Sequence, residues 1–192
     1  MLRNIYLTLS PLILGGICNI LFTKTAFYRA HKTPLDRGKC LRDGKRIFGD
    51  NKTVIGGISM ILFCTLLQIL CGILCNALSW NRYNHLYDRY PNTLLLNALF
   101  GALVGLIYIL FELPNSFLKR RLGIGAGNGG RGLVGVLFFL LDQIDSLIGV
   151  MLLLCLFSGL GIGHYFLYLA VGAVTHVGIN LILRLFKLRK RL

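Results

Sequence analysis

Long apolar runs dominate the chain and alternate with short polar stretches. The runs cover residues 5–22, 54–78, 94–113, 133–157 and 160–186. Each approaches the roughly 20 residues that a helix needs to cross the hydrocarbon core of a bilayer. None shows the strict two-residue alternation of a membrane β-strand. The pattern predicts an all-α integral membrane protein, a bundle of about five transmembrane helices forming a single domain over residues 1–192.

The fourth run can be divided in two ways. As one helix, residues 133–157 would be about 38 Å long at 1.5 Å per residue, which exceeds the hydrocarbon core. The alternative is a short interfacial or re-entrant piece over residues 133–140, with the span proper beginning near Leu141. We favour the second division, because it places Asp142 and Asp145 at the mouth of the membrane, where a charge costs less.

Composition agrees with a membrane protein, and the distribution of charge predicts its orientation. The chain is 55% hydrophobic, which is more than a soluble domain of this length would contain, and its net charge is +14. Nine of the Lys and Arg residues lie between residues 23 and 53, and most others follow the third and fifth runs. The positive-inside rule therefore predicts an outside N-terminus, a cytoplasmic C-terminus and cytoplasmic loops at about 24–53 and 112–140.

The excess of positive charge does not predict a nucleic-acid partner. The basic segments alternate with membrane spans, and no nucleic-acid reading module accompanies them. The basic tail, with Arg184, Lys187, Arg189, Lys190 and Arg191, could simply hold anionic lipid headgroups. The six cysteines lack the spacing of metal ligands.

Two acidic residues, Asp142 and Asp145, interrupt the fourth run. Three residues apart on a helix, they share one face, with Cβ atoms roughly 5–6 Å apart, and their like charges repel. Carboxylates persist in such surroundings when they bind a cation or form ion pairs with basic side chains of another segment. We favour a bound cation, because idle carboxylates are costly in apolar surroundings. Carboxylates that hold Mg²⁺ beside a basic cluster also fit a site for polyphosphate.

His176 and Asn180 lie in the last run at a spacing of four residues, so they share a helix face. The spacing alone favours hydrogen bonds between helices, which membrane bundles use widely. Asn19 in the first run has the same interpretation.

Five motifs, in this order, carry a family resemblance. They are Pro34-Leu-Asp-Arg-Gly38, Arg42-Asp-Gly-Lys-Arg-Ile-Phe-Gly-Asp-Asn-Lys-Thr53, Ser116-Phe-Leu-Lys-Arg-Arg-Leu-Gly-Ile124, Asp142-Gln-Ile-Asp145 and His176-x-x-x-Asn180. In these motifs the chain resembles the CDP-archaeol synthase family, within the wider group of membrane CTP:phosphatidate-type cytidylyltransferases. Two positions depart from that pattern: Ile55 stands where an Arg is common, and Glu112 stands where an Asp is usual.

The resemblance implies transfer of a cytidylyl group from CTP to a membrane lipid phosphate, giving a CDP-lipid and pyrophosphate for phospholipid synthesis. It implies Mg²⁺ as cofactor, CTP and a lipid phosphate as partners, and an active site at the cytoplasmic face. Asp142, Asp145 and Lys119 would be catalytic, and Asp142, Asp145 and Glu112 would hold the metal. The implied substrate-binding residues are Asp43, Gly44, Arg46, Gly49, Lys52, Thr53, Asn115, Ser116, Arg120, Arg121, His176 and Asn180. The lipid, ether isoprenoid or diacyl, and the oligomeric state stay open.

Two other function classes compete with this interpretation. A small ion-coupled transporter could use Asp142 and Asp145 as its ion site, and it would be indifferent to CTP. A basic membrane scaffold would tolerate neutralisation of both residues. The concentration of motifs at one face, without charges deep in the other runs, argues against the transporter.

Overall fold

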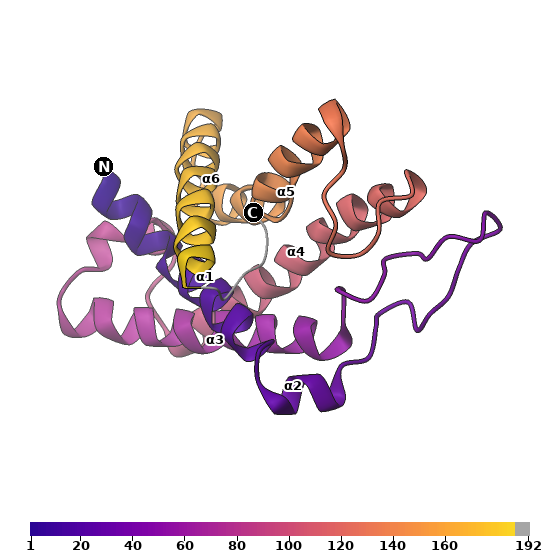
Figure 1. The fold of residues 1–192 in the computed structure, drawn as a ribbon. Coiled ribbons are helices and arrows are strands. Elements are labelled where there is room, and N and C mark those ends of the chain that lie inside the picture. The colour runs from indigo at the N-terminus through magenta and orange to yellow at the C-terminus, as the bar shows by residue number, and fades with distance from the viewer. Residues whose placement is uncertain (187–192) are drawn as a thin grey trace.

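The computed structural model describes residues 1–186, which form helices joined by turns and loops. The long helices are α1 (Leu2–Phe22), α3 (Val54–Ala77), α4 (Leu94–Arg121), α5 (Gly132–Ser158) and α6 (Ile162–Leu185), with a short α2 (Ala26–His31) between the first two (Figure 1). Two single-turn 3₁₀ helices, η1 (Asn81–Tyr83) and η2 (His85–Asp88), lie between α3 and α4. Within the described residues, extended pairing is limited to isolated bridges. The five long helices are long and apolar enough to cross a membrane, which confirms the predicted all-α membrane fold.

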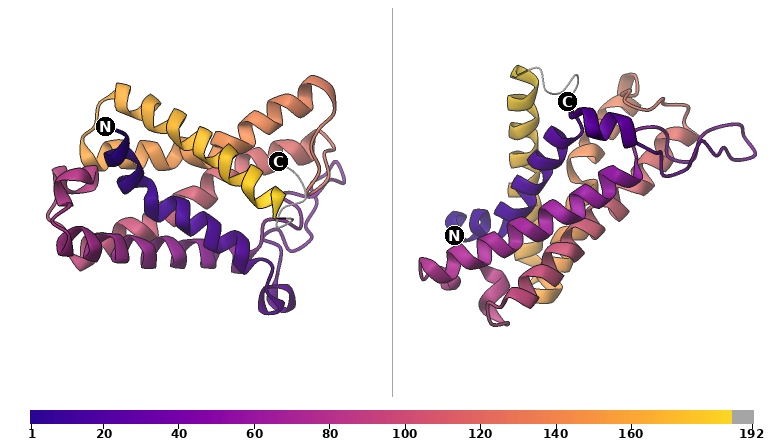
Figure 2. Two further views of the ribbon diagram at one scale, coloured as in Figure 1. Left: turned by 60° about the vertical axis from the view of Figure 1, so that its left-hand side comes forward. Right: turned by 90° about the horizontal axis from the view of Figure 1, so that it is seen from below.

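The helices pack in chain order. α3 lies against both α1 and α4, α4 lies against α5, and α5 lies against α6. Because successive long helices run in opposite directions, the segments after α1 and α4 and the end of α6 gather at one end of the bundle (Figure 2). The N-terminus and the connection with η1 and η2 lie at the other end. The polar segments with most of the motifs are thus brought together, whereas the side of the membrane that they face stays a prediction.

Threonine caps set where two spans begin. Thr53 accepts a hydrogen bond from the Gly56 amide at 3.1 Å, and Thr93 accepts one from the Leu96 amide at 3.2 Å. Each hydroxyl satisfies a backbone donor that has no partner inside the helix. The predicted starts at residues 54 and 94 are confirmed.

The second polar segment differs from the prediction. The loop expected at 112–140 is short, because α4 continues to Arg121 and α5 already begins at Gly132. α4 continues beyond Pro114, a residue that ordinarily ends or bends a helix. The side chains of the following turn, Asn115 and Lys119, contact α5, and such tertiary contacts outweigh the local preference.

The favoured division of the fourth span is also wrong. Residues 132–158 form one continuous helix, without a separate interfacial piece before Leu141. The apolar residues before Asp142 include no helix-breaking proline, and Phe138 among them is buried. At 1.5 Å per residue the helix is about 40 Å long, a length that membrane helices accommodate by tilting or by projecting beyond the hydrocarbon.

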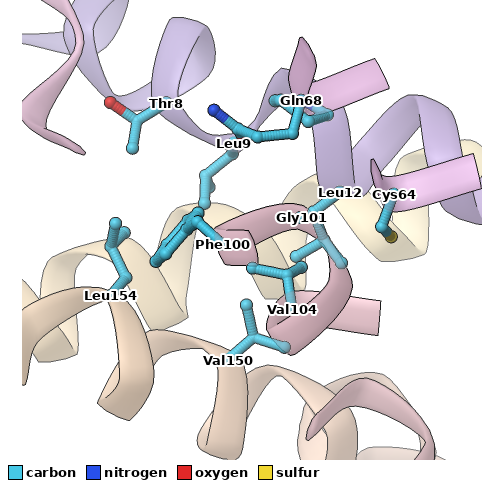
Figure 3. Close-up of a pocket in the computed structure, with 11 residues that line it drawn as sticks. Thr8, Leu9, Leu12, Cys64, Gln68, Phe100, Gly101, Val104, Val150 and Leu154 are labelled. Atoms are coloured by element: carbon cyan, nitrogen blue, oxygen red, sulfur yellow. The ribbon is translucent and has the colours of Figure 1, made fainter. Parts of the chain in front are cut away.

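The interior of the bundle has little free space. A cavity of about 10 Å³ lies where α1, α3, α4 and α5 meet, between Leu9, Phe100 and Val150, with Thr8 and Gln68 at its edge (Figure 3). That volume holds at most about one water molecule.

Arg184 of the basic tail lies in the last turn of α6, and the other four basic residues of the tail lie outside the described residues. Lys187, Arg189, Lys190 and Arg191 were expected to hold lipid headgroups, and this stays a prediction.

Gly101 lets α3 and α4 approach closely, and this predicts the effect of a methyl group there. A Cβ at Gly101 would lie 2.7 Å from the Cys64 carbonyl oxygen and from the Thr65 Cα, both backbone atoms of α3. Gly101→Ala should destabilise the protein by about 1–3 kcal/mol, as overpacking does. Gly16→Ala is the matched control, because its Cβ would meet nothing within 4 Å. Thermal unfolding in detergent should show a lower midpoint for Gly101→Ala, and an unchanged or higher one for Gly16→Ala.

Candidate active site

The two carboxylates of α5 are bridged from α4. The Nδ2 group of Asn115 donates to Asp142 Oδ1 and to Asp145 Oδ2, both at 2.7 Å. The ammonium group of Lys119, one turn further along α4, lies 2.5 Å from both oxygens of Asp142. The second oxygen of Asp145 accepts from the Ser146 amide at 2.7 Å. The structure thus brings the motif of Asp142 and Asp145 together with Lys119 of another motif and with Asn115, the residue directly before that motif.

A second ion pair joins the first loop to the same region of α4. Lys52, just before the cap of α3, pairs with Glu112, and both side chains are about three-quarters buried. Burial opposes the charge of Lys52, but Glu112, Asp145 and Asp142 outweigh it and raise the pKa of the ammonium group. Glu112 lies one helical turn before Asn115 on α4, so its pair with Lys52 adjoins the charged cluster of Asp142 and Asp145.

A buried carboxylate organises the first loop. The Asp36 side chain is fully buried and accepts hydrogen bonds from the backbone amides of Gly38, Phe48 and Gly49 at 3.1, 2.9 and 2.8 Å. The guanidinium of Arg46 completes the set with contacts of 3.2 and 2.5 Å. Burial alone would raise the pKa of Asp36, but the bonds from Arg46 and the three amides outweigh it and hold the pKa well below its usual range.

Arg121 fixes the tip of this loop to the end of α4. Its guanidinium contacts both oxygens of Asp43 at 2.6 Å and donates to the backbone carbonyls of Lys45 and Arg46. Lys45 returns a bond of 2.6 Å to the Arg121 carbonyl. The Lys45 amide, together with Arg121, lowers the pKa of Asp43, so the carboxylate is ionised in the folded loop.

A basic recess lies between the loops. It has a volume of about 240 Å³ and is lined by Lys45, Arg46, Gly49, Asp50, Arg120 and residues 123–126. Arg120 is largely buried, and its guanidinium makes a long contact of 3.4 Å with the Ser116 carbonyl. Gly49 forms part of the wall at a backbone φ of +90°, and Gly44 turns the loop tip at +73°, conformations that favour glycine. With three cations and one carboxylate in its lining, the recess suits an anion.

The other predicted residues have mainly structural contacts. Thr53 caps α3 and bonds the Tyr28 hydroxyl at 2.9 Å. His176 lies 3.2 Å from the Gln143 carbonyl oxygen, and Asn180 donates to the Gln143 side chain at 3.1 Å. These are the interhelical bonds that the spacing favoured, and they hold α6 beside Gln143, the residue that follows Asp142. A direct role of His176 and Asn180 in substrate binding stays a prediction.

Sequence reasoning assigned no site role to Asp36 or Gln143. Both lie inside motifs that carry the family resemblance, and an acid within Pro34-Leu-Asp-Arg-Gly38 was a usable signal. The burial of Asp36 and the contacts of Gln143 depend on segments far apart in the chain, so the motifs alone could not show them.

Comparison with known proteins identifies the family. The family model described as CDP-archaeol synthase (CarS-like) matches residues 2–191. The chain is 32% identical over 179 residues to the CDP-archaeol synthase of Pyrococcus furiosus, covering 90% of this chain and 82% of that protein. It is 30% identical over 158 residues to the CDP-archaeol synthase of Saccharolobus solfataricus, covering 82% and 80%. This chain belongs to the CDP-archaeol synthase family.

A solved structure agrees with the fold. It is described as "Structural insight into an intramembrane enzyme for archaeal membrane lipids biosynthesis", and it matches with a TM-score of 0.61 and 22% identity over 92% of both chains. Family membership makes the chain a CTP-dependent nucleotidyltransferase, and its five apolar helices make it an integral membrane protein. The reaction of the family is cytidylyl transfer from CTP to a lipid phosphate.

The Asp36 contacts predict that the first loop depends on one negative charge. Asp36→Asn should speed amide hydrogen exchange at Phe48 and Gly49 by about tenfold or more at neutral pH, because charge-assisted bonds at a buried group are lost. Asp50→Asn is the control, since the Asp50 side chain is 71% exposed and has one ion pair with the same Arg46.

The lowered pKa of Asp36 also sets the pH dependence of this loop. A carboxylate with a depressed folded-state pKa stabilises at all pH values above its ordinary pKa of 3.8, and this is lost only as the pH falls through the lowered value. Protection of the two amides, corrected for intrinsic exchange, should therefore be equal at about pH 7 and about pH 5. A loss of protection between those values would contradict the assignment.

Proposed function

We propose that this member of the CDP-archaeol synthase family transfers the cytidylyl group of CTP to the phosphate of an ether-linked isoprenoid glycerol lipid, an archaetidic-acid-like acceptor. A phosphatidic-acid-like diacyl acceptor is the second candidate. The observation that supports the proposal best is the cluster of Asp142, Asp145, Asn115 and Lys119 at the end of an apolar bundle, beside two basic loops.

The donor atoms of the cluster suit Mg²⁺. In the described part of the chain, no group of three or more His, Cys, Asp or Glu side chains is placed to hold a metal ion. Mg²⁺, however, is commonly held by one or two carboxylates while the substrate phosphates and water supply the other ligands. The Oδ1 atom of Asn115 is buried without a hydrogen-bond partner beside Asp142 and Asp145, and offers a further oxygen.

We therefore assign Asp142 and Asp145 as the metal ligands, with Glu112 next to them. When bound there, Mg²⁺ would neutralise charge on the triphosphate and on the leaving pyrophosphate. Glu112 already pairs with Lys52, and Asp142 with Lys119. The two ammonium groups thus supply the positive charge that the carboxylates require, and they do so at the positions where phosphate groups would approach.

The reaction needs little covalent participation by the protein. An oxygen of the lipid phosphate attacks the α-phosphorus of CTP and forms a new P–O bond. The bond between the α-phosphorus and the oxygen that bridges it to the β-phosphate, which lies in line with the attack, breaks and releases pyrophosphate. Lys119 and Lys52 would donate to the phosphates, and Arg46, Arg120 and Lys45 line the recess that suits the remaining negative charge. Positioning and electrostatic stabilisation then account for most of the rate.

The location of the cluster suits one lipid and one soluble substrate. Asp142 lies on a membrane-spanning helix. Arg46 and Lys52 belong to the first polar loop, and Arg121 at the end of α4 contacts that loop. By the positive-inside rule this end faces the cytoplasm, where CTP is available. An ether isoprenoid acceptor is the first choice because the relatives that match over most of the chain are named CDP-archaeol synthases. The ion-coupled transporter gains no support from this family.

A panel of acceptors tests the lipid. Purified protein with labelled CTP and Mg²⁺ should label an ether-linked isoprenoid glycerol phosphate with a kcat/KM at least about tenfold above that for diacyl phosphatidic acid, a difference of about 1.4 kcal/mol. Equal use of both would contradict the lipid assignment and leave the reaction intact. Labelling of neither, with ion flux in liposomes, would contradict the reaction itself.

The pairing of Lys119 with Asp142 predicts how metal binding responds to mutation. Without nucleotide, Lys119→Gln should bind Mn²⁺ about tenfold more tightly than wild type, because the ammonium group that competes for Asp142 is gone. The electron paramagnetic resonance signal of Mn²⁺ measures this binding. The same variant should lose about 100-fold or more in kcat, because a donor to the phosphates is missing. Asp145→Asn should lose both Mn²⁺ binding and activity. Unchanged Mn²⁺ binding in Asp145→Asn would contradict the metal site.

A further inference from the structure

The short helix α2 lies at the same end of the bundle but outside the cluster described above. It begins four residues after the end of α1, so it is located where the apolar length of that span stops. Figure 2 (left) shows α2 almost end-on, whereas α1 and α6 run across the view. Its axis is therefore directed across the spans, as a helix lying along a membrane surface would be.

One face of α2 is fixed to the bundle. Tyr28 is buried, and its ring meets the ring of Phe22 edge-on at 5.8 Å between centroids. Its hydroxyl lies 2.9 Å from the Thr53 hydroxyl, which also caps α3. These contacts hold α2 against the start of α3, so its other face has a defined direction.

The exposed side chains on and beside α2 combine an aromatic ring with positive charge. Phe27 is 59% exposed and stacks on His31 at 4.4 Å between ring centroids. Lys24, Arg29 and Lys32 are exposed, and none of them forms an ion pair with another residue in the described part of the chain. The sequence contains no Asp or Glu before Asp36, whose carboxylate is already occupied by Arg46.

We propose that residues 24–32, here the α2 elbow, form a binding surface for the headgroups of anionic lipids. Lys24, Arg29 and Lys32 contact the lipid phosphates, and the Phe27 ring inserts at the level where headgroups meet acyl chains. Basic residues beside a span are attracted to anionic leaflets, and an aromatic ring next to them adds apolar contact. The surface lacks acidic groups of its own, so its counter-charge comes from the bilayer.

This surface also has a mechanical connection to the first loop. Tyr28 of the elbow and Thr53 at the end of the loop share a hydrogen bond, and Lys52 of the charged cluster is the neighbour of Thr53. Headgroup binding at the elbow therefore holds the carboxy-terminal end of the first loop at the membrane surface.

A single-tryptophan reporter tests the proposal. Trp80, the only tryptophan of the chain, directly precedes η1 in the connection at the opposite end of the bundle. It is replaced by Phe. Phe27→Trp then reports the elbow in proteoliposomes that contain brominated phosphatidylglycerol or, separately, brominated phosphatidylcholine at the same mole fraction. We expect quenching by both lipids, with phosphatidylglycerol about twice as effective because the basic residues enrich it locally.

Two triple variants of this reporter, each lacking three positive charges, distinguish headgroup binding at the elbow from a general attraction of the basic loop to anionic lipid. Lys24→Gln with Arg29→Gln and Lys32→Gln should reduce the phosphatidylglycerol effect to the level of phosphatidylcholine. Arg37→Gln with Lys39→Gln and Arg42→Gln removes three exposed charges from the same loop and should leave the preference unchanged. Absence of quenching by either lipid, equal quenching in the parent reporter, or an equal loss in both triples would each overturn the proposal.

Discussion

The polar end of the molecule depends on one constraint: the negative charges of Asp142 and Asp145 on α5 must be offset by side chains of α4. Residues 132–158 of α5 contain no Lys, Arg or His, so this helix cannot neutralise its own carboxylates. The compensating groups, Asn115 and Lys119, come from α4. They lie after Pro114, and they reach α5 only because α4 remains helical through and beyond the proline.

The same principle extends from the bundle to the first loop. Glu112 and Arg121 of α4 pair with Lys52 and Asp43 of the loop, so opposite charges join the two segments at two places on α4. Inside the loop, Asp36 gathers three backbone amides and Arg46 around one buried carboxylate. Four of the candidate site's charged side chains, Lys52, Glu112, Lys119 and Asp142, are therefore held in opposite-charge pairs, whereas Asp145 is held by neutral donors.

Much of the candidate site could be recognised from the sequence, because its motifs are local. The Asp142–Asp145 pair and the basic run at residues 119–121 were visible as residue types at a given spacing. Their partners were not visible. Asp43 and Arg121 were both assigned to substrate, yet they bind each other, and His176 and Asn180 are held by Gln143. A motif shows which functional groups are present, but it does not show which segments from elsewhere in the chain lie near them in space.

The sequence by itself determined the five spans and the concentration of positive charge in alternate connections. These are local properties, since the length of an apolar run and the charge beside it require no knowledge of neighbours. The tertiary structure alone decided that α4 continues to Arg121, that α5 is unbroken before Leu141, and which acid pairs with which base. A helix end near a proline and the partner of a carboxylate both depend on contacts between helices, because the free energy of burying a charge is set by what surrounds it.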